Sequence, residues 1–504
     1  MPSVQPIPPL LGALLGRIVF EGVTHALPAL PPIVGGTWGG IELSGLWGPL
    51  TVVGSDLEWE VDPVFGVDVD WKLRAIDGFS NESAVFQLAD GRKLSVRFGG
   101  VTRRGVRPRL GHGRVVELNS WNLEGRAPAR WVGNLVGFPS SVGNLKIVKG
   151  ANDFSRMNVR LEGNYTWYIV SPRGRHEDEH VVVAVVEPRP DGPSSFDRDA
   201  IGVDFMALQF AYGTAMQMDT MVAVDEPGNV IGGAGLGFGG ERRRALTDGP
   251  VPRRGFWEPI LFHRLTRAMN TLTLPWGVVC TAYLDSTSDP TIDGRYLRLH
   301  VALEGFARAL LSDTAQEGRL QKSGTKRLLV KDEKSWKAWL KTHASAVRDL
   351  AVDERGYDVL LGKLHQAIQP PSSATVTDTL SRLEPPLAVD DRVLTELRGR
   401  NIPAHHGTMN KPNVDYDVER DVERVDILRT LLVAIVSRAC GYDGPIVGWD
   451  RRATPDWKPV PPWWPAPSPA TVAEASVRFA SGDRQRPRAH RAPAFGSRIR
   501  TRPR

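Results

Sequence analysis

The sequence has little of several features that would place it in a familiar class. Among 504 residues only Cys280 and Cys440 are cysteines, which argues against a disulfide framework and against a cysteine-based zinc cluster. No apolar run approaches the roughly 20 residues that cross a bilayer. The stretch from Met1 to Leu15 lacks the basic residues that begin a signal peptide. We therefore expect a cytoplasmic protein that has no membrane partner.

Most of the chain also lacks a large excess of positive or negative charge. The net charge is +6, yet the last 54 residues, from Arg451 onward, hold 12 Lys/Arg and 3 Asp/Glu and contribute +9. The other 450 residues therefore sum to −3. This C-terminal segment, 451–504, is rich in Pro, Arg, Ala and Ser, which predicts a disordered basic tail. Trp463 and Trp464 lie in it among prolines, where we expect them to stack on unpaired bases while the arginines contact phosphates.

Residues 15–288 have the pattern of a β-rich domain. Short runs such as Ala84–Leu88 and Val181–Val186 alternate or stay apolar for a few residues. Turn signals such as Asp90-Gly91 and Gly228-Asn229 separate them. Many short strands with frequent turns predict a sandwich-like fold or another antiparallel β architecture. Two helices are expected to close this domain, near Phe205–Tyr212 and near Trp257–Asn270.

The pattern changes to helical spacing after Pro290, and residues 292–445 are predicted to form an all-α bundle. The longest helix is expected over Tyr416–Cys440, where apolar residues form one stripe that is wide enough to favour a homodimer. The other helices are expected at these ranges: Tyr296–Leu311, Trp336–Leu350, Tyr357–Ile368 and a helix ending at Val393–Leu397. The fold class is therefore α+β and multidomain.

A short segment between the last two of these helices suggests chemistry. Arg400 and His405 are five positions apart, and Asn401 follows the arginine. An arginine holds a phosphate through a bidentate fork, and a histidine moves a proton near neutral pH. The spacing alone is weak, because the pairs Arg107/His112 and Arg295/His300 share it.

The segment resembles the motif of HEPN domains, the higher-eukaryote-and-prokaryote nucleotide-binding helical bundles. Their signature is an arginine, four to six residues, and then a histidine. The whole layout, a β-rich region before the bundle, is similar to the ApeA-type anti-phage defence proteins. Two further segments resemble these proteins more weakly, Phe205–Gly213 and Ala302-Leu303-Glu304. Pro403 prevents a continuous helix through the motif, so Arg400 and His405 cannot be related by simple helix geometry.

The resemblance implies metal-independent RNA cleavage, with no cofactor, at a site shared by two protomers. His405 would transfer a proton, and Arg400 would stabilise charge on the phosphate. Asn401 would orient either the phosphate or the histidine. The 2′-OH would attack the adjacent phosphate and leave a cyclic phosphate. His406 is a second candidate for the proton transfer, and Glu304 is a candidate to orient Arg400.

The expected substrate is RNA, including tRNA as one candidate, and Arg398 is expected to contact it. The run Arg242, Arg243 and Arg244 is a further candidate for RNA contact. The β-rich domain would sense an unknown trigger. The alternative is a non-catalytic ligand-binding protein whose HEPN-like bundle only dimerises. Two other motifs are rejected: the H-E-x-x-H match at 176–180 precedes a strand, and the G-x-G-x-x-G match at 235–240 lacks its helix and acidic residue.

Overall fold

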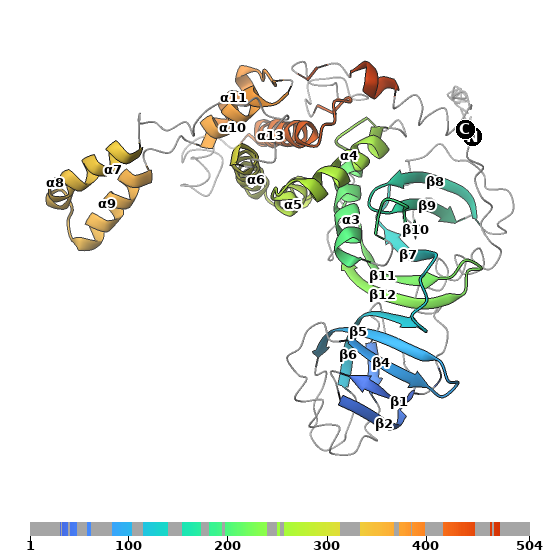
Figure 1. Cartoon of the computed structure of the whole chain (residues 1–504). Helices are drawn as coiled ribbons and strands as arrows, with labels where there is room; N and C mark the ends of the chain where they lie inside the picture. The colour runs from blue at the N-terminus through green and yellow to red at the C-terminus, as the bar shows by residue number, and fades with distance from the viewer. Residues whose placement is uncertain are drawn as a thin grey trace, which may run out of the picture.

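A computed structural model of the chain gives the fold (Figure 1). It describes residue 31 and the ranges 33–38, 41–47, 58–61, 83–102, 114–139, 154–172, 181–193, 197–238, 249–252, 257–312, 333–366, 372–384, 386–398, 417–448, 464–465 and 468–473. Within these ranges the protein is α+β, as expected.

The strands form one large antiparallel sheet. They are β1 (Ile33–Trp38), β2 (Ile41–Trp47), β3 (Glu58–Val61), β4 (Ser83–Leu88), β5 (Lys93–Thr102), β6 (Arg114–Leu123), β7 (Arg130–Val136), β8 (Phe154–Glu162), β9 (Thr166–Pro172), β10 (Val181–Glu187), β11 (Met218–Val224) and β12 (Val230–Phe238). Their order is β2-β1-β4-β5-β6-β12-β11-β7-β10-β9-β8, and β3 pairs with β6. The expected antiparallel β architecture is therefore confirmed, and every described strand belongs to one hydrogen-bonded sheet.

The sheet narrows where β6 meets β12. This junction is three residue pairs long, Gly232↔Asn122, Gly233↔Trp121 and Ala234↔Ser120. A Cβ atom on Gly232 would lie 2.6 Å from the carbonyl oxygen of Trp121, so the close approach requires glycine. Figure 1 shows β1–β6 curling away from β7–β12 at this junction, and the helices lie against the second part.

The predicted turns are confirmed by their backbone. Gly91 has φ 88°, in the left-handed region, and the backbone N of Leu88 donates to the carbonyl of Arg92 across the turn (2.8 Å). In the β11–β12 turn, Oδ1 of Asp225 accepts hydrogen bonds from the backbone N of Gly228 (3.0 Å) and of Asn229 (2.7 Å). A short polar side chain thus replaces backbone partners at the turn.

Most predicted helices are also confirmed. The described helices are α3 (Arg198–Tyr212), α4 (Trp257–Thr271), α5 (Trp276–Ser288), α6 (Ile292–Ser312), α7 (Glu333–Thr342), α8 (Ala344–Asp349), α9 (Glu354–Gln366), α10 (Ser372–Arg382), α11 (Asp391–Arg398) and α13 (Val418–Ala439). Asp197 caps the N-terminus of α3 by accepting from the backbone N of Asp199 and Ala200, and Gly213 ends it with φ 63°.

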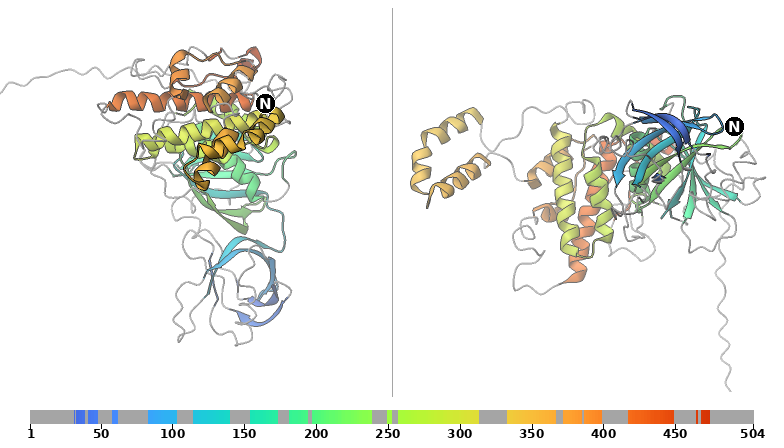
Figure 2. Two further views of the ribbon diagram at one scale, coloured as in Figure 1. Left: turned by 90° about the vertical axis from the view of Figure 1, so that its left-hand side faces the viewer. Right: turned by 90° about the horizontal axis from the view of Figure 1, so that it is seen from below.

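One hydrophobic core joins the sheet to the helices. Its buried residues include Trp167 on β9, Phe205 on α3, Tyr283 on α5, Phe306 on α6 and Leu432 on α13. Helices α5 and α6 pack against each other although a domain boundary was expected between residues 288 and 292. The core is therefore continuous across that position, and Figure 2 shows α5, α6 and α13 packed together on one side of the sheet.

Helix α13 is buried on nearly all sides by its own chain. Side chains from Val425 to Cys440 are buried except for the half-buried Ile427, and α4, α5, α6 and α11 pack around them. The apolar stripe that favoured a homodimer is thus covered within one protomer. Dimerisation stays a prediction, but the width of this stripe no longer supports it.

Part of the expected tail also belongs to the core. Trp464 is 4% exposed, and its Nε1 donates to the carbonyl of Gly444 (2.9 Å). The guanidinium of Arg438 lies 4.5 Å from the centre of its ring. The prediction that Trp464 stacks on RNA bases from a disordered tail is therefore wrong, while Trp463 lies outside the described residues.

Helices α7, α8 and α9 form an arm that is separate from the bundle. The core includes no described residue of 333–366, although these helices were expected inside the bundle. Figures 1 and 2 show the arm projecting from the rest of the molecule. We call residues 333–366 the arm from here on.

Candidate functional site at the α11–α13 junction

The segment with the Arg–His motif lies outside the described residues. This applies to Arg400, Asn401, His405 and His406, and also to the Arg242–Arg244 run. The helices on either side are described: α11 ends at Arg398, and α13 begins at Val418 after its N-cap, Asp417. The surroundings of the candidate site can therefore be built from these two helices.

A charged pocket of about 340 Å³ lies between α11 and α13. It is lined by Asp391, Arg392, Thr395, Glu396, Arg420, Glu423, Arg424 and Ile427. Three of these side chains are basic and three are acidic, so the lining is balanced in charge.

The inner wall of the pocket is a hydrogen-bonded network around Arg424. Its Nε donates to Oε2 of Glu396 (2.8 Å), and its Nη2 donates to the hydroxyl of Tyr296 on α6 (3.2 Å). The guanidinium also lies 4.8 Å from the centre of the Tyr296 ring. The Tyr296 hydroxyl donates to Oε2 of Glu396 (3.1 Å). The network ties α6, α11 and α13 together.

Burial and charge set the protonation of this network. Burial alone would lower the pKa of Arg424, but its hydrogen bond to Glu396 and the attraction of the carboxylate outweigh burial and raise it. Burial, together with the negative charge of Glu396, raises the pKa of the Tyr296 hydroxyl. Arg424 therefore stays charged and Tyr296 stays neutral near pH 7.

The other cations near the motif differ in their partners. Arg392 pairs with Glu423 across the pocket. By contrast, the exposed side chains of Arg398, at the end of α11, and of Arg420, in the first turn of α13, form no ion pair with a described residue. These two cations flank the motif segment in the chain.

Glu304 has a partner other than the expected one. Its Oε1 accepts from Nη2 of Arg308, one turn along α6 (2.8 Å), and its side chain is 13% exposed. A pairing with Arg400 involves a residue outside the described ranges and stays a prediction. The Arg295/His300 pair is structural: Arg295 donates to the carbonyl of Asp289 (2.6 Å), and His300 is buried against the ring of Tyr296.

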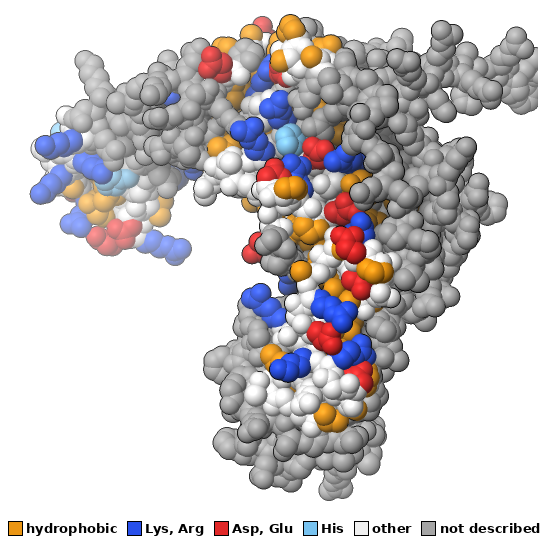
Figure 3. Space-filling model, turned by 45° about the vertical axis from the view of Figure 1, so that its right-hand side comes forward, with side chains coloured by type: hydrophobic (Ala, Val, Ile, Leu, Met, Phe, Trp, Pro, Cys, Tyr) orange, Lys and Arg blue, Asp and Glu red, His pale blue; other side chains and the backbone are white. Residues whose placement is uncertain are grey.

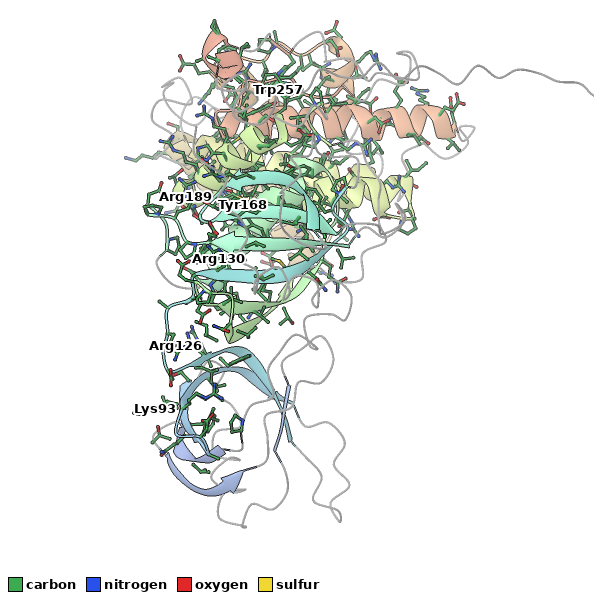
Figure 4. The ribbon with its side chains drawn as sticks, turned by 90° about the vertical axis from the view of Figure 1, so that its right-hand side faces the viewer. Lys93, Arg126, Arg130, Tyr168, Arg189 and Trp257 are labelled. Atoms are coloured by element: carbon green, nitrogen blue, oxygen red, sulfur yellow. The ribbon has the colours of Figure 1, made fainter. Side chains whose placement is uncertain are left out.

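The outer face of the sheet carries charges of both signs. Arg130 pairs with Glu187 (2.6 Å), and Arg189 pairs with Asp191 (2.9 Å). Figure 4 shows Arg130, Tyr168 and Arg189 on one side of the sheet, and Figure 3 shows basic and acidic side chains interleaved along it. Because the charges offset one another, this face does not form a basic surface for a phosphate backbone.

Asp204 on α3 is a second chemically distinctive group. It is fully buried, and its carboxylate accepts from the backbone N of Asn164 (2.8 Å) and of Tyr165 (3.1 Å) and from Nε1 of Trp167 (2.8 Å). Burial raises its pKa to about 6 against the effect of these donors. The three donors belong to the β8–β9 turn and to β9, so Asp204 positions that turn against α3.

Comparisons with known proteins do not assign this chain to a family, so its function has to be argued from its residues. No family model matches the chain, and neither a curated protein nor a solved structure matches it. Among the described residues there is no group of three or more His, Cys, Asp or Glu that would hold a metal ion. No helix in the described ranges is long and apolar enough to span a bilayer.

The sequence interpretation missed the Arg424 network. Tyr296 and Glu396 are 100 positions apart, and Arg424 is 28 positions beyond Glu396. The only local signal is a tyrosine, a glutamate and an arginine on predicted helices, each of which reads as an ordinary surface residue. The packing of three helices brings them together.

Proposed function

We propose that this protein is a metal-independent endoribonuclease of the HEPN type, acting in anti-phage defence or growth arrest, with the β-rich region as its sensor. The observation that carries the proposal is the position of the motif. Arg400 and His405 belong to the segment joining α11 to α13, the two helices that line the charged pocket. Two exposed cations that form no ion pair with a described residue, Arg398 and Arg420, flank that segment in the chain and suit an RNA backbone.

The reaction follows from the residue types. The 2′-oxygen of a ribose attacks the adjacent phosphorus as its proton passes to His405, and the 5′-oxygen leaves as its bond to phosphorus breaks. Arg400 stabilises the charge that develops on the phosphoryl oxygens. Asn401 orients the phosphate, and His406 is the second candidate for proton transfer. A proton returned to the leaving oxygen gives a 2′,3′-cyclic phosphate and a 5′-hydroxyl.

The Arg424 network supports a fixed geometry for this segment. It joins α11 and α13 through Glu396 and connects both to α6 through Tyr296. Helices that are held on both sides of a connecting segment restrict where that segment can lie, which favours a pre-organised site.

The test compares Arg400→Ala and His405→Ala with a pair that has the same spacing, Arg107→Ala and His112→Ala. Purified full chains are incubated with tRNA and total RNA, with and without EDTA. Only the Arg400 and His405 variants should lose cleavage, and the products should end in cyclic phosphate. Cleavage that persists in both variants, or that requires magnesium, would show that the motif is not the active site. RNA binding without cleavage by the unmodified chain would favour the ligand-binding alternative.

A further inference from the structure

The arm formed by α7–α9 exposes more of its large hydrophobic side chains than it buries. Among its described hydrophobic residues only Leu340 and Val347 are buried. Ten large hydrophobic side chains are exposed in the part of the chain that the structure describes, and five of them belong to the arm: Trp339, Leu350, Val352, Val359 and Leu360. The helices of the arm have 10, 6 and 13 residues, lengths that are marginal for isolated helices. A surface that covers these side chains would therefore stabilise the arm.

One side of α9 packs within the arm. Tyr357, Leu361 and Leu364 follow helical spacing on this side and are half-buried. The guanidinium of Arg348 on α8 lies 4.6 Å from the centre of the Tyr357 ring, and Nε1 of Trp336 on α7 donates to the carbonyl of Leu364 (3.2 Å). These contacts hold α9 against α7 and α8 and fix which side of the helix remains open to a partner.

A second side of α9 faces solvent. Gly356, Val359, Leu360 and Lys363 have the i, i+3, i+4, i+7 spacing that places residues on one face of a helix. Val359 is 51% exposed and Leu360 is 37% exposed. We call these four residues the outer face of α9. A surface helix needs one apolar face toward its own core, so a second apolar face is typical of a helix that is covered on two sides.

Opposite charges lie at the two ends of the outer face. Asp353 precedes α9 and caps its N-terminus, where Oδ1 accepts from the backbone N of Gly356 (2.6 Å). Lys363 lies at the other end. Both side chains are exposed, and neither forms an ion pair with another described residue. A face that is negative at one end and positive at the other is complementary to its own antiparallel copy.

We infer that the outer face of α9 binds the same face in a second copy of this chain, as an antiparallel pair related by a two-fold axis. Asp353 and Lys363 each lie five positions from Asp358 in the sequence. An axis that crosses the two helices near Asp358 therefore brings the Lys363 of each copy to the Asp353 of the other.

The same axis fits the shapes of the apolar residues. Gly356 and Leu360 each lie two positions from Asp358, so the leucine of each copy meets the glycine of the other. Glycine has no side chain to obstruct a leucine that approaches from a second helix. Val359 lies beside the axis and meets its own copy. Two independent pairs, one charged and one apolar, thus define the same register.

The charges of α9 favour a second copy over a membrane. A helix that lies in a membrane surface carries mainly Lys and Arg on its polar face and is attracted to anionic lipids. Helix α9 has the acidic residues Glu354 and Asp358, and Asp353 caps it, so these carboxylates oppose such an attraction. The inference is independent of the proposed ribonuclease activity.

Cross-linking tests the position of the axis. Val359→Cys places a thiol beside the axis, and the oxidant diamide should join two such thiols as an intermolecular disulfide in the full chain. The product is a dimer band on a non-reducing gel, run after free thiols are blocked. The native Cys280 and Cys440 are both buried, which keeps the background low. Asp358→Cys lies one position away on another side of α9, so this matched control should not cross-link.

Sedimentation equilibrium of the full chain tests the contact itself. The unmodified chain should form a reversible dimer with a Kd of about 1–100 µM, as expected for a small interface. Leu360→Asp should weaken it by about 10-fold or more, because the dimer would bury a carboxylate. Gly356→Ala should weaken it by about 10-fold, because a methyl group takes the space of the leucine. Gly362→Ala, off the outer face and with open space around it, is the matched control and should dimerise normally.

The glycine variant also separates contact from folding. Alanine favours a helix more than glycine does, so a weaker Gly356→Ala dimer cannot be explained by a loss of helix, and circular dichroism checks this. Lys363→Glu brings like charges together at both ends of the pair. It should weaken the dimer, and the loss should shrink as salt screens the charges.

Several results would overturn the inference. A chain that stays monomeric throughout the micromolar range has no such contact. A dimer that Leu360→Asp and Gly356→Ala leave unchanged forms through another surface. Equal cross-linking of Asp358→Cys and Val359→Cys would reflect random collision. Binding to anionic phospholipid vesicles without dimerisation would identify a membrane surface. None of these readouts uses RNA cleavage, so failure of the ribonuclease proposal would be distinguishable.

Discussion

Asp204 offers the sharpest test of how this fold is held together. The substitution Asp204→Ala removes the acceptor of three buried donors, the backbone N of Asn164, the backbone N of Tyr165 and Nε1 of Trp167. Each donor left without a partner costs about 1–3 kcal/mol. Relief of a buried charge offsets part of that cost. We expect the free energy of unfolding to fall by about 3–6 kcal/mol, which is large for one substitution.

Asp204→Asn separates the hydrogen bonds from the charge. The amide has the same shape but only one acceptor oxygen, so at least one of the three donors faces an NH₂ group. We expect a loss of about 1–3 kcal/mol at neutral pH. The two variants are compared with the unmodified chain by urea unfolding, which is monitored by far-UV circular dichroism. Equal slopes of unfolding free energy against urea concentration would show that all three chains expose the same surface on unfolding.

The pH dependence tests the balance between burial and hydrogen bonding. Burial raises the pKa of Asp204 to about 6, so between pH 4 and pH 6 the folded protein binds this proton more strongly than the unfolded chain. The unmodified protein should lose about 3 kcal/mol of stability from this group as the pH rises through that interval. Its stability advantage over Asp204→Asn should therefore shrink with rising pH.

One outcome would refute this reasoning. If the advantage over Asp204→Asn grows between about pH 4 and pH 7, the three donors dominate burial and the pKa lies below its ordinary value. The titratable groups that interact with Asp204 are Tyr165 and Arg189. Burial raises the pKa of Tyr165 to about 12, and the hydrogen bond to Asp191 raises the pKa of Arg189, so both keep their protons between pH 4 and pH 7. The observed slope can then be assigned to Asp204.

Two further predictions concern packing in the helical region. A chain ending before Arg451 should lose about 3–5 kcal/mol because it lacks Trp464, whereas a chain ending after Ala473 keeps that anchor and should unfold within about 0.5 kcal/mol of the full chain. Equal stability of the two truncations in urea unfolding would mean that the tryptophan does not anchor the segment. Arg424→Met should cost about 2–4 kcal/mol, since it leaves its part-buried acidic partners without a cation, while the more exposed ion pair lost in Arg392→Met should cost less than about 1 kcal/mol. Similar losses in both variants, measured by thermal unfolding, would contradict the account of the Arg424 network.

The sequence by itself determined the local elements. The 3.6-residue repeat fixed α4, α6 and α13 to within a few residues, because helical hydrogen bonds and the apolar stripe are both local in the chain. Helix α3 was found at its C-terminal end only, since it begins at Arg198 and not near Phe205. The turn at Asp90-Gly91 was equally readable, since it depends on one residue tolerating positive φ. The Arg400–His405 motif was found by the same local reading, but its chemistry still rests on resemblance.

Only the tertiary structure decided which elements meet. A period of two marks a strand but does not choose its neighbours, so one sheet could not be told from a sandwich. An amphipathic pattern shows that a helix has an apolar face without showing what covers it. For this reason the patterns of α7 and α13 predicted the same bundle, although α7 lies in the arm and α13 in the core. Asp204 and Trp464 are buried by residues that are distant in the sequence, so their burial cannot be predicted from the neighbouring residues alone.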